Sequence, residues 1–386
     1  MNRFTTACLL SVLGSASLVP AATAQTSAPV AFVYVSNNPN NSSTNNIHAY
    51  TAAADGKLTP VVGSPFADDV TSLAVNGKYL FGSTRNGIYV TAFTMQPNGS
   101  LRWANSTDVV RDNESECGVS GPLFLDHTGS TIYDMEFNGD GCSNNAYESF
   151  AVNKAKGSLQ SQTMGPSSTS YYLPATFIGN NQYAYTAVCQ NNMYWTIAGF
   201  RRSANGALTN VNANAAVPAA PANDFWCPSQ AAADPTNHVA MSFQAINNNF
   251  APDGPARLAT YTAEANGTLS SISTLANMPV TAVGAVSGLA MAPSGKLLAA
   301  GGSAGLQIFH FNGAAPITKD TGLLVKTPID QLFWDNARHL YAISRATGKL
   351  YVFTITPTSA VKAPGSPYAI QNPQYLIVQP RTSLAR

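Results

Sequence analysis

Residues 47–61 read IHAYTAAADGKLTPV, two runs of strand-forming residues on either side of an Asp-Gly pair. Asp-Gly supplies the positive φ angles of a tight hairpin turn, so this stretch predicts two antiparallel strands. Similar phrases recur at 90–104 (VTAFTMQPNGSLRWA), 147–161, 197–211 and 258–272, with two degenerate copies at 306–320 and 350–364. The second turn residues, 43 to 61 positions apart, are Gly56, Gly99, Gly157, Gly206, Gly267, Gly313 and Ser359.

A second hairpin precedes most copies, as in SLAVNGKYLFGS (72–83) and QLFWDNARHLYAIS (331–344). Four short strands per repeat of about 50 residues, seven times over, predict an all-β fold, a seven-bladed β-propeller with four antiparallel strands per blade. A two-domain sandwich is the alternative architecture. We label the strands of each blade A to D, from the central channel outward.

The first repeat is incomplete, and this predicts how the ring closes. It begins with AFVYVSN (31–37), a B strand without an A strand before it, while PQYLIVQP (373–380) is left over after the last D strand. We therefore expect the C-terminal strand to complete the first blade and leave no open sheet edge. The similar words GSPF (63–66) and GSPY (365–368) then belong to outer strands of neighbouring blades, one and seven.

The N-terminal 24 residues predict a secretory signal peptide, cut after Ala24, ahead of a single propeller domain at 25–386. Their apolar stretch is short and broken by Gly14, Ser15 and Ser17, so we expect no membrane insertion. The formal net charge is +1 and no basic patch is visible, which argues against a nucleic-acid partner. The expectation is an exported monomer, periplasmic or secreted.

Cysteine usage is consistent with export. Once Cys8 leaves with the signal peptide, an even number of cysteines remains, which favours two disulfides. Propeller geometry places the ends of one hairpin together, which predicts Cys117–Cys142. It also places Cys189 and Cys227 on the same face of neighbouring blades, which predicts the second bridge.

Ring topology sorts the connections onto two faces. The D–A and B–C connections share one face, here called the loop face, and the A–B and C–D turns share the other, the turn face. The longest loops fall on the loop face, where function usually sits on a rigid scaffold. Its acids are Asp68, Asp69, Asp112, Glu114, Glu116, Asp140, Asp224, Asp253 and Asp330, and its bases are Arg85, Arg111, Arg257, Lys326 and Arg345. Lysines expected on the turn face are Lys57, Lys78, Lys154, Lys156, Lys296 and Lys349.

The words FVYVSNN (32–38), GKYLFGS (77–83) and GKLTPVVGSPF (56–66), in seven copies, resemble the seven-bladed lactonase propellers. That family includes 6-phosphogluconolactonase and carboxymuconate cyclase relatives and overlaps the YVTN-repeat propellers. The resemblance covers about 25–380 and rests on blade scaffolding, so it implies the fold more strongly than the chemistry. It implies a lactone hydrolase acting at the channel mouth, with His, Glu and Arg side chains.

This chain departs from that pattern in its histidines. His127, His238 and His339 fall in or beside A–B turns, and His48 and His310 on C strands, where we expect scaffold roles. Lactone hydrolysis needs a base for water and a cation for the developing oxyanion. The candidate base is Glu136, at the loop-face end of a B strand. The candidate cations are Arg85 and Arg345, at the ends of the B strands in blades two and seven; inter-blade ion pairs are the alternative role.

Binding without catalysis is the second hypothesis, with a carbohydrate or a protein as the partner. Aromatic rings beside amides and carboxylates suit sugar rings or a protein surface. The alternative is that these rings pack beneath the long loops. The candidate ligand-binding residues are Tyr171, Tyr172, Tyr194, Trp195, Asp224, Phe225 and Trp226. We expect no cofactor and no metal site, because no ligand spacing or phosphate-binding glycine loop is present.

Overall fold

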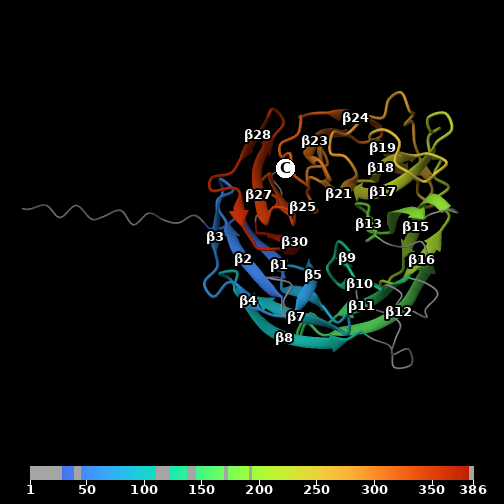
Figure 1. The fold of residues 1–386 in the computed structure, drawn as a ribbon. Helices are drawn as coiled ribbons and strands as arrows, with labels where there is room; N and C mark the ends of the chain where they lie inside the picture. Colours follow the sequence, from blue (N-terminus) through green and yellow to red (C-terminus); the bar gives the residue numbers. More distant parts are fainter. Residues whose placement is uncertain are drawn as a thin grey trace, which may run out of the picture.

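The computed structural model describes residues 28–38, 45–109, 121–136, 145–168, 173–190 and 194–381. Within these ranges all regular secondary structure is β-strand, and the strands form seven antiparallel sheets. The sheets stand side by side in a ring around a central channel (Figure 1). The fold is therefore the seven-bladed β-propeller that the repeats predict.

Blade one is assembled from both ends of the chain. Its outer strands are β1 (Ala31–Asn37), β2 (Asn46–Ala52) and β3 (Leu58–Pro60), with the short β4 (Phe66–Ala67) also paired to β2. Its inner strand is β30 (Pro373–Pro380), which pairs antiparallel with β1 over the whole length of β1. The predicted closure of the ring by the C-terminal strand is confirmed.

Blades two to four follow in chain order from the inner strand outward. Blade two comprises β5 (Val70–Val75), β6 (Tyr79–Thr84), β7 (Tyr89–Met95) and β8 (Leu101–Asp108). Blade three comprises β9 (Leu123–Leu125), β10 (Thr131–Glu136), β11 (Asn145–Val152) and β12 (Leu159–Ser168). Blade four comprises β13 (Thr176–Phe177), β14 (Tyr183–Gln190), β15 (Tyr194–Arg202) and β16 (Leu208–Val211).

Blades five to seven repeat the same order. Blade five comprises β17 (Phe225–Ala233), β18 (His238–Ile246), β19 (Arg257–Ala263) and β20 (Leu269–Ser270). Blade six comprises β21 (Val286–Met291), β22 (Leu297–Gly302), β23 (Gly305–Asn312) and β24 (Ala315–Lys319). Blade seven comprises β25 (Gln331–Trp334), β26 (His339–Ser344), β27 (Lys349–Thr356) and β28 (Ser359–Lys362), with β29 (Tyr368–Ala369) also paired to β27.

The two Gly-Ser-Pro segments, 63–65 and 365–367, are structurally equivalent. Each lies where an outer strand breaks, between β3 and β4 in blade one and between β28 and β29 in blade seven. The hydroxyl of Ser64 accepts the N–H of Ala49 at 2.9 Å, and that of Ser366 accepts the N–H of Val352 at 2.9 Å. Both serines thus satisfy a C-strand donor that the broken outer strand leaves without a ladder partner.

The hydrophobic core is divided among the blade interfaces. The described residues form seven buried clusters, and each joins two neighbouring blades. The cluster between blades seven and one, for example, packs Val33 and Val35 of β1 against Tyr341 and Ile343 of β26. Because the two faces of each sheet pack against different neighbours, no blade can bury its apolar surface alone.

The repeated hairpin glycines fit against the preceding blade. Gly99 of blade two has φ +87°, and a Cβ there would lie 2.8 Å from the ring of Phe32 in blade one. The equivalent distances are 2.9 Å from Gly157 to Tyr79, 2.4 Å from Gly206 to Thr131 and 2.5 Å from Gly267 to Tyr183. Each contacted residue stands at the start of a B strand, so the glycine sets how closely two blades can approach.

Buried tyrosines hold the same hairpins by hydrogen bonds. The hydroxyl of Tyr34 donates to the carbonyl of Gly99 at 3.0 Å, Tyr133 to Gly206 at 2.7 Å and Tyr185 to Gly267 at 2.9 Å. Burial raises the pKa of each of these tyrosines well above its ordinary value of 10. These tyrosines therefore remain protonated hydrogen-bond donors at neutral pH.

One lysine, Lys349, lies on the loop face and not on the turn face, where the sequence predicted it. Lys349 is the first residue of β27 and follows the B–C turn at 345–348, which places it on the loop face. The sequence misleads here because Gly-Lys closes both kinds of turn: TGKL at 347–350 resembles SGKL at 294–297, an A–B turn.

Substitution of the hairpin glycine tests the blade contact. Gly99→Ala adds a Cβ against Phe32 to a backbone at φ +87°, so we expect the free energy of unfolding to fall by about 2–4 kcal/mol. Gly77→Ala is the matched control, since Gly77 has φ +90° but nothing within 4 Å of an added Cβ; we expect a loss of about 1 kcal/mol there. Equal losses in equilibrium urea unfolding would show that the contact with Phe32 contributes nothing.

Candidate functional site

The central channel holds a cavity of about 620 Å³, within the range typical of small-molecule sites. It is lined by the inner strands β5, β9, β13, β17, β21, β25 and β30 and by the residues that lead into them (Figure 1). Its apolar side chains include those of Leu73, Phe124, Leu289, Leu332 and Leu376. The channel wall therefore combines large apolar side chains with polar ones, among them Thr176, Gln230, Ser287 and Gln331.

Several polar side chains of the channel region are used to join inner strands. Ser72 Oγ accepts the N–H of Leu123 at 2.8 Å, Gln331 Oε1 that of Leu376 at 2.7 Å and Thr176 Oγ1 that of Ala233 at 3.1 Å. The hydroxyl of Ser287 donates to the carbonyl of Ile329. These groups link neighbouring blades at the axis, which leaves few channel polar groups for a ligand.

β-Bulges change which residues face the channel. Register shifts occur in four inner strands: between Val70 and Leu73, between Pro228 and Gln230, between Val286 and Gly288, and between Pro373 and Tyr375. Each shift interrupts the two-residue alternation of side chains along its strand. Gln230 and Ser287 line the channel beside two of these shifts.

Asp330 and Arg345 meet at the loop-face end of the channel. Asp330 precedes β25 and lines the cavity, and its Oδ2 accepts the backbone N–H of Arg345 at 2.7 Å. Its Oδ1 makes no hydrogen bond to the described part of the chain. The exposed guanidinium of Arg345 donates through Nη2 to the carbonyl of Gln374, just inside β30, at 2.8 Å. A carboxylate and a cation therefore flank the junction of blades seven and one.

The two other predicted catalytic residues lie elsewhere on the loop face. Arg85 follows β6 in blade two, with blade one between it and Arg345; its Nε is 3.7 Å from Asp69 Oδ1, and the two side chains are 45% and 40% exposed. Such an exposed pair contributes little to stability. Glu136 is the last residue of β10, in blade three, and its side chain lies outside the described residues. Its role stays a prediction.

The predicted aromatic sector is described only in part. Trp226 is 3% exposed and packs against Phe243, with ring centroids 6.0 Å apart, so its ring belongs to the core between blades four and five. Phe225, 39% exposed, is the accessible ring, beside the half-buried Asp224. Tyr171 and Tyr172 lie outside the described residues, as do the side chains of Tyr194 and Trp195.

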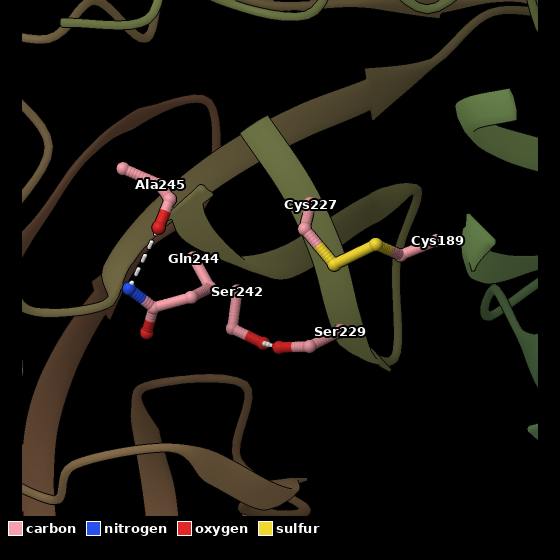
Figure 2. The surroundings of a disulfide bond; sticks show 6 residues. All are labelled: Cys189, Cys227, Ser229, Ser242, Gln244 and Ala245. Atoms are coloured by element: carbon pink, nitrogen blue, oxygen red, sulfur yellow. Dashed lines mark hydrogen bonds between the residues drawn. A yellow bond between two sulfur atoms is a disulfide. The ribbon is translucent and has the colours of Figure 1, made fainter. Parts of the chain in front are cut away.

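A disulfide between Cys189 and Cys227 joins β14 of blade four to β17 of blade five, as predicted (Figure 2). Beside it on blade five the hydroxyls of Ser229 and Ser242 are 2.8 Å apart, and the amide of Gln244 donates to the carbonyl of Ala245 (Figure 2). A disulfide in this position is compatible with export. Cys117 and Cys142 lie outside the described residues, so their bridge stays a prediction.

Removal of the bridge tests its contribution to the ring. It spans 38 residues, so a Cys189→Ser, Cys227→Ser double variant is expected to lose about 3–4 kcal/mol of unfolding free energy. Denaturant unfolding of the oxidised protein and the variant gives the difference. Full reduction of the wild-type protein gives a second value for the loss of unfolding free energy. If that loss equals the loss in the double variant, the whole effect of reduction belongs to this bridge. An unchanged midpoint in the double variant would contradict the prediction.

At the turn-face end the channel opens between charged and amide side chains. His127 lines this end, and its ring lies edge-on to Phe177 with centroids 6.1 Å apart. Partial withdrawal from water lowers the pKa of His127, outweighing its hydrogen bonds with the backbone of Gly179 and Phe177 and the nearby Asp126 charge. The expected A–B turn position is confirmed, but sequence reasoning missed that this histidine reaches the channel.

Asp126 holds the A–B turn next to it. Its side chain is fully buried, and Oδ2 lies 2.9 Å from Nη2 of Arg202 on the neighbouring blade. Burial alone would raise the pKa of Asp126, but hydrogen bonds from Thr128, Thr131 and Asn181 and the charge of Arg202 outweigh it and lower the pKa. The carboxylate is thus a structural anion between blades three and four.

The lowered pKa of Asp126 makes stability depend on pH. Its contribution is fully present above the unfolded pKa of about 4 and is lost as the pH falls through the lower folded value. Asp126→Asn leaves Arg202 without its carboxylate, so we expect a loss of about 2–4 kcal/mol at pH 7 that narrows below about pH 4. Asp55→Asn, on an exposed turn of the same face, is the control, with a change within about 0.5 kcal/mol. A gap that stays constant down to pH 2 would contradict the charge argument.

The described residues contain no group of three or more His, Cys, Asp or Glu side chains placed to hold a metal ion. They also contain no helix of the length and apolarity needed to cross a membrane.

No family model matches this chain, and no curated protein matches it in sequence. Solved structures match over most of its length. A proposed 6-phosphogluconolactonase from Bacteroides fragilis is 15% identical with a TM-score of 0.67, covering 92% of this chain and 99% of that one. Another from Bacteroides uniformis is 13% identical with a TM-score of 0.65, covering 91% and 99%.

A periplasmic gluconolactonase from Pseudomonas aeruginosa is 15% identical with a TM-score of 0.64, and the match covers 90% of this chain and 99% of that one. At these identities the likeness establishes the fold. The chain has the propeller fold of the lactonase-type proteins, as the repeat words imply.

Proposed function

We propose that this protein is an exported hydrolase that opens a lactone ring at the loop-face mouth of its channel. The observation that carries the proposal is Asp330, which lines a cavity of small-molecule size and whose carboxylate accepts the backbone N–H of the cationic residue Arg345. The lactonase names of proteins with the same fold support this reaction class. The periplasmic neighbour and the Cys189–Cys227 bridge support export.

The residues at the mouth suit ester hydrolysis. The Asp330 carboxylate takes a proton from a water molecule as the water oxygen bonds to the lactone carbonyl carbon. The guanidinium of Arg345 stabilises the negative charge that develops on the carbonyl oxygen. The ring C–O bond then breaks, and the proton held by Asp330 passes to the alkoxide. Lactone and water thus give one hydroxy acid, with no further reactant.

Hydrolysis by Asp330 and Arg345 needs no second subunit and no cofactor. The mouth is built from blades seven and one of a single chain, so we infer that a monomer acts on a small molecule. Phe225 favours the second candidate function, because an exposed ring beside Asp224 could hold a carbohydrate or a protein without catalysis. A lactone hydrolase turns over its substrate and a binding protein does not, so one measurement of lactone turnover distinguishes the two functions.

The test follows acid release from glucono-δ-lactone, δ-valerolactone and an aromatic lactone by the mature protein from Gln25 onward. We expect turnover above the uncatalysed rate, with kcat lowered about 100-fold or more by Asp330→Asn and by Arg345→Gln. Asp253→Asn, an exposed acid on the same face, is the control and should leave kcat unchanged.

A Glu136→Gln variant is measured beside these, since Glu136 is the base predicted from the sequence. Loss of turnover in Glu136→Gln with full activity in Asp330→Asn would move the base to blade three. Absence of turnover on every lactone would overturn the hydrolase and favour the binding function.

A further inference from the structure

The middle of the channel presents apolar side chains that the fold leaves partly exposed. Phe124, Leu125, Leu289, Leu332 and Phe333 all line the cavity, and none of them is buried. Large apolar side chains gathered around one cavity, rather than scattered singly over a surface, mark a site for an apolar ligand. Their removal from water by such a ligand would be favourable.

The same wall offers little to a polar ligand. Ser72, Thr176, Ser287 and Gln331 are already hydrogen-bonded to neighbouring strands. Besides Asp126, His127 and Asp330, the other polar side chains that line the cavity are Gln230, which makes no hydrogen bond to the described residues, and Tyr375, whose hydroxyl bonds Ser72. Sugar hydroxyls entering this space would give up hydrogen bonds to water without gaining enough partners, which is unfavourable.

One wall position, on β21, keeps the channel open. Gly288 of β21 lines the cavity, and an added Cβ would meet only Leu332 Cδ1, at 4.0 Å. Gly288 has no positive φ, so its backbone accepts a side chain. The residue therefore leaves free volume where a ligand seated at Asp330 would extend into the channel.

We propose that the channel selects lactones that carry an apolar substituent, with the ring at Asp330 and Arg345 and the substituent among Leu289, Leu332 and Phe124. This inference rests on the proposed function for the placement of the ring. Either an alkyl chain or an aromatic ring would supply the apolar surface that these side chains contact. The cavity of about 620 Å³ accommodates a ligand of that size.

The test compares a series with one ring: glucono-δ-lactone, δ-valerolactone, δ-octalactone and δ-decalactone. We expect kcat/KM to rise about three- to fourfold for each added methylene, and to be lowest for the sugar lactone. Gly288→Phe should lower kcat/KM for δ-decalactone at least tenfold more than it lowers kcat/KM for δ-valerolactone. Gly322→Phe is the matched control, because Gly322 lies outside the channel with nothing within 4 Å of an added Cβ.

Equilibrium binding of the uncharged fluorophore N-phenyl-1-naphthylamine gives a readout that needs no turnover. We expect one site, displaced by δ-decalactone, that is lost in Gly288→Phe and kept in Gly322→Phe. Hydrolysis with no gain along the alkyl series, or an unchanged profile in Gly288→Phe, would overturn the apolar selection and leave the hydrolase standing. Fluorophore binding that meets these criteria without any turnover would keep the apolar site and overturn the hydrolase. Absence of both fluorophore binding and turnover would overturn the apolar site and the hydrolase together.

Discussion

The contact between a hairpin glycine and the preceding blade sets the spacing of the whole ring. Gly99, Gly157, Gly206 and Gly267 each lack the Cβ that would collide with the first residues of the neighbouring B strand. Tyrosine hydroxyls then bond the carbonyls of the same hairpins, as Tyr34 does for Gly99. Since each blade needs its neighbour to bury its apolar faces, this repeated contact fixes the register of one blade on the next.

Closure of the ring extends the same dependence to the two ends of the chain. β30 supplies the inner strand of blade one, so the last strand of the sequence holds the first one. The Tyr368 hydroxyl of blade seven accepts the N–H of Leu58 in blade one at 2.8 Å, which ties the outer strands as well. Blade one is therefore a complete sheet like the other blades, and the inner strands are held at fixed positions around the axis.

The fixed inner strands explain the character of the channel. Polar side chains such as Thr176 and Gln331 serve neighbouring backbone donors, because a bond missing at the axis would leave a buried N–H without a partner. Ionisable groups lie at the two ends of the channel, with Asp330 at the loop face and His127 at the turn face. An apolar channel with reactive groups at its mouth thus follows from how the blades are joined.

The sequence by itself determined the repeat, the strand order, the closure by residues 373–380 and the Cys189–Cys227 bridge. These follow from local turn chemistry and from a count of strands, and both are written in contiguous residues. Only the tertiary structure decided which side chains share the channel and that Trp226 is part of the core. β-Bulges at Gln230 and Gly288 break the two-residue alternation, and β13 is only two residues long, so no pattern marks the channel side. Asp330 and Gln374 are 44 positions apart and meet through Arg345 only when the ring closes, because blade closure, not sequence distance, brings them together.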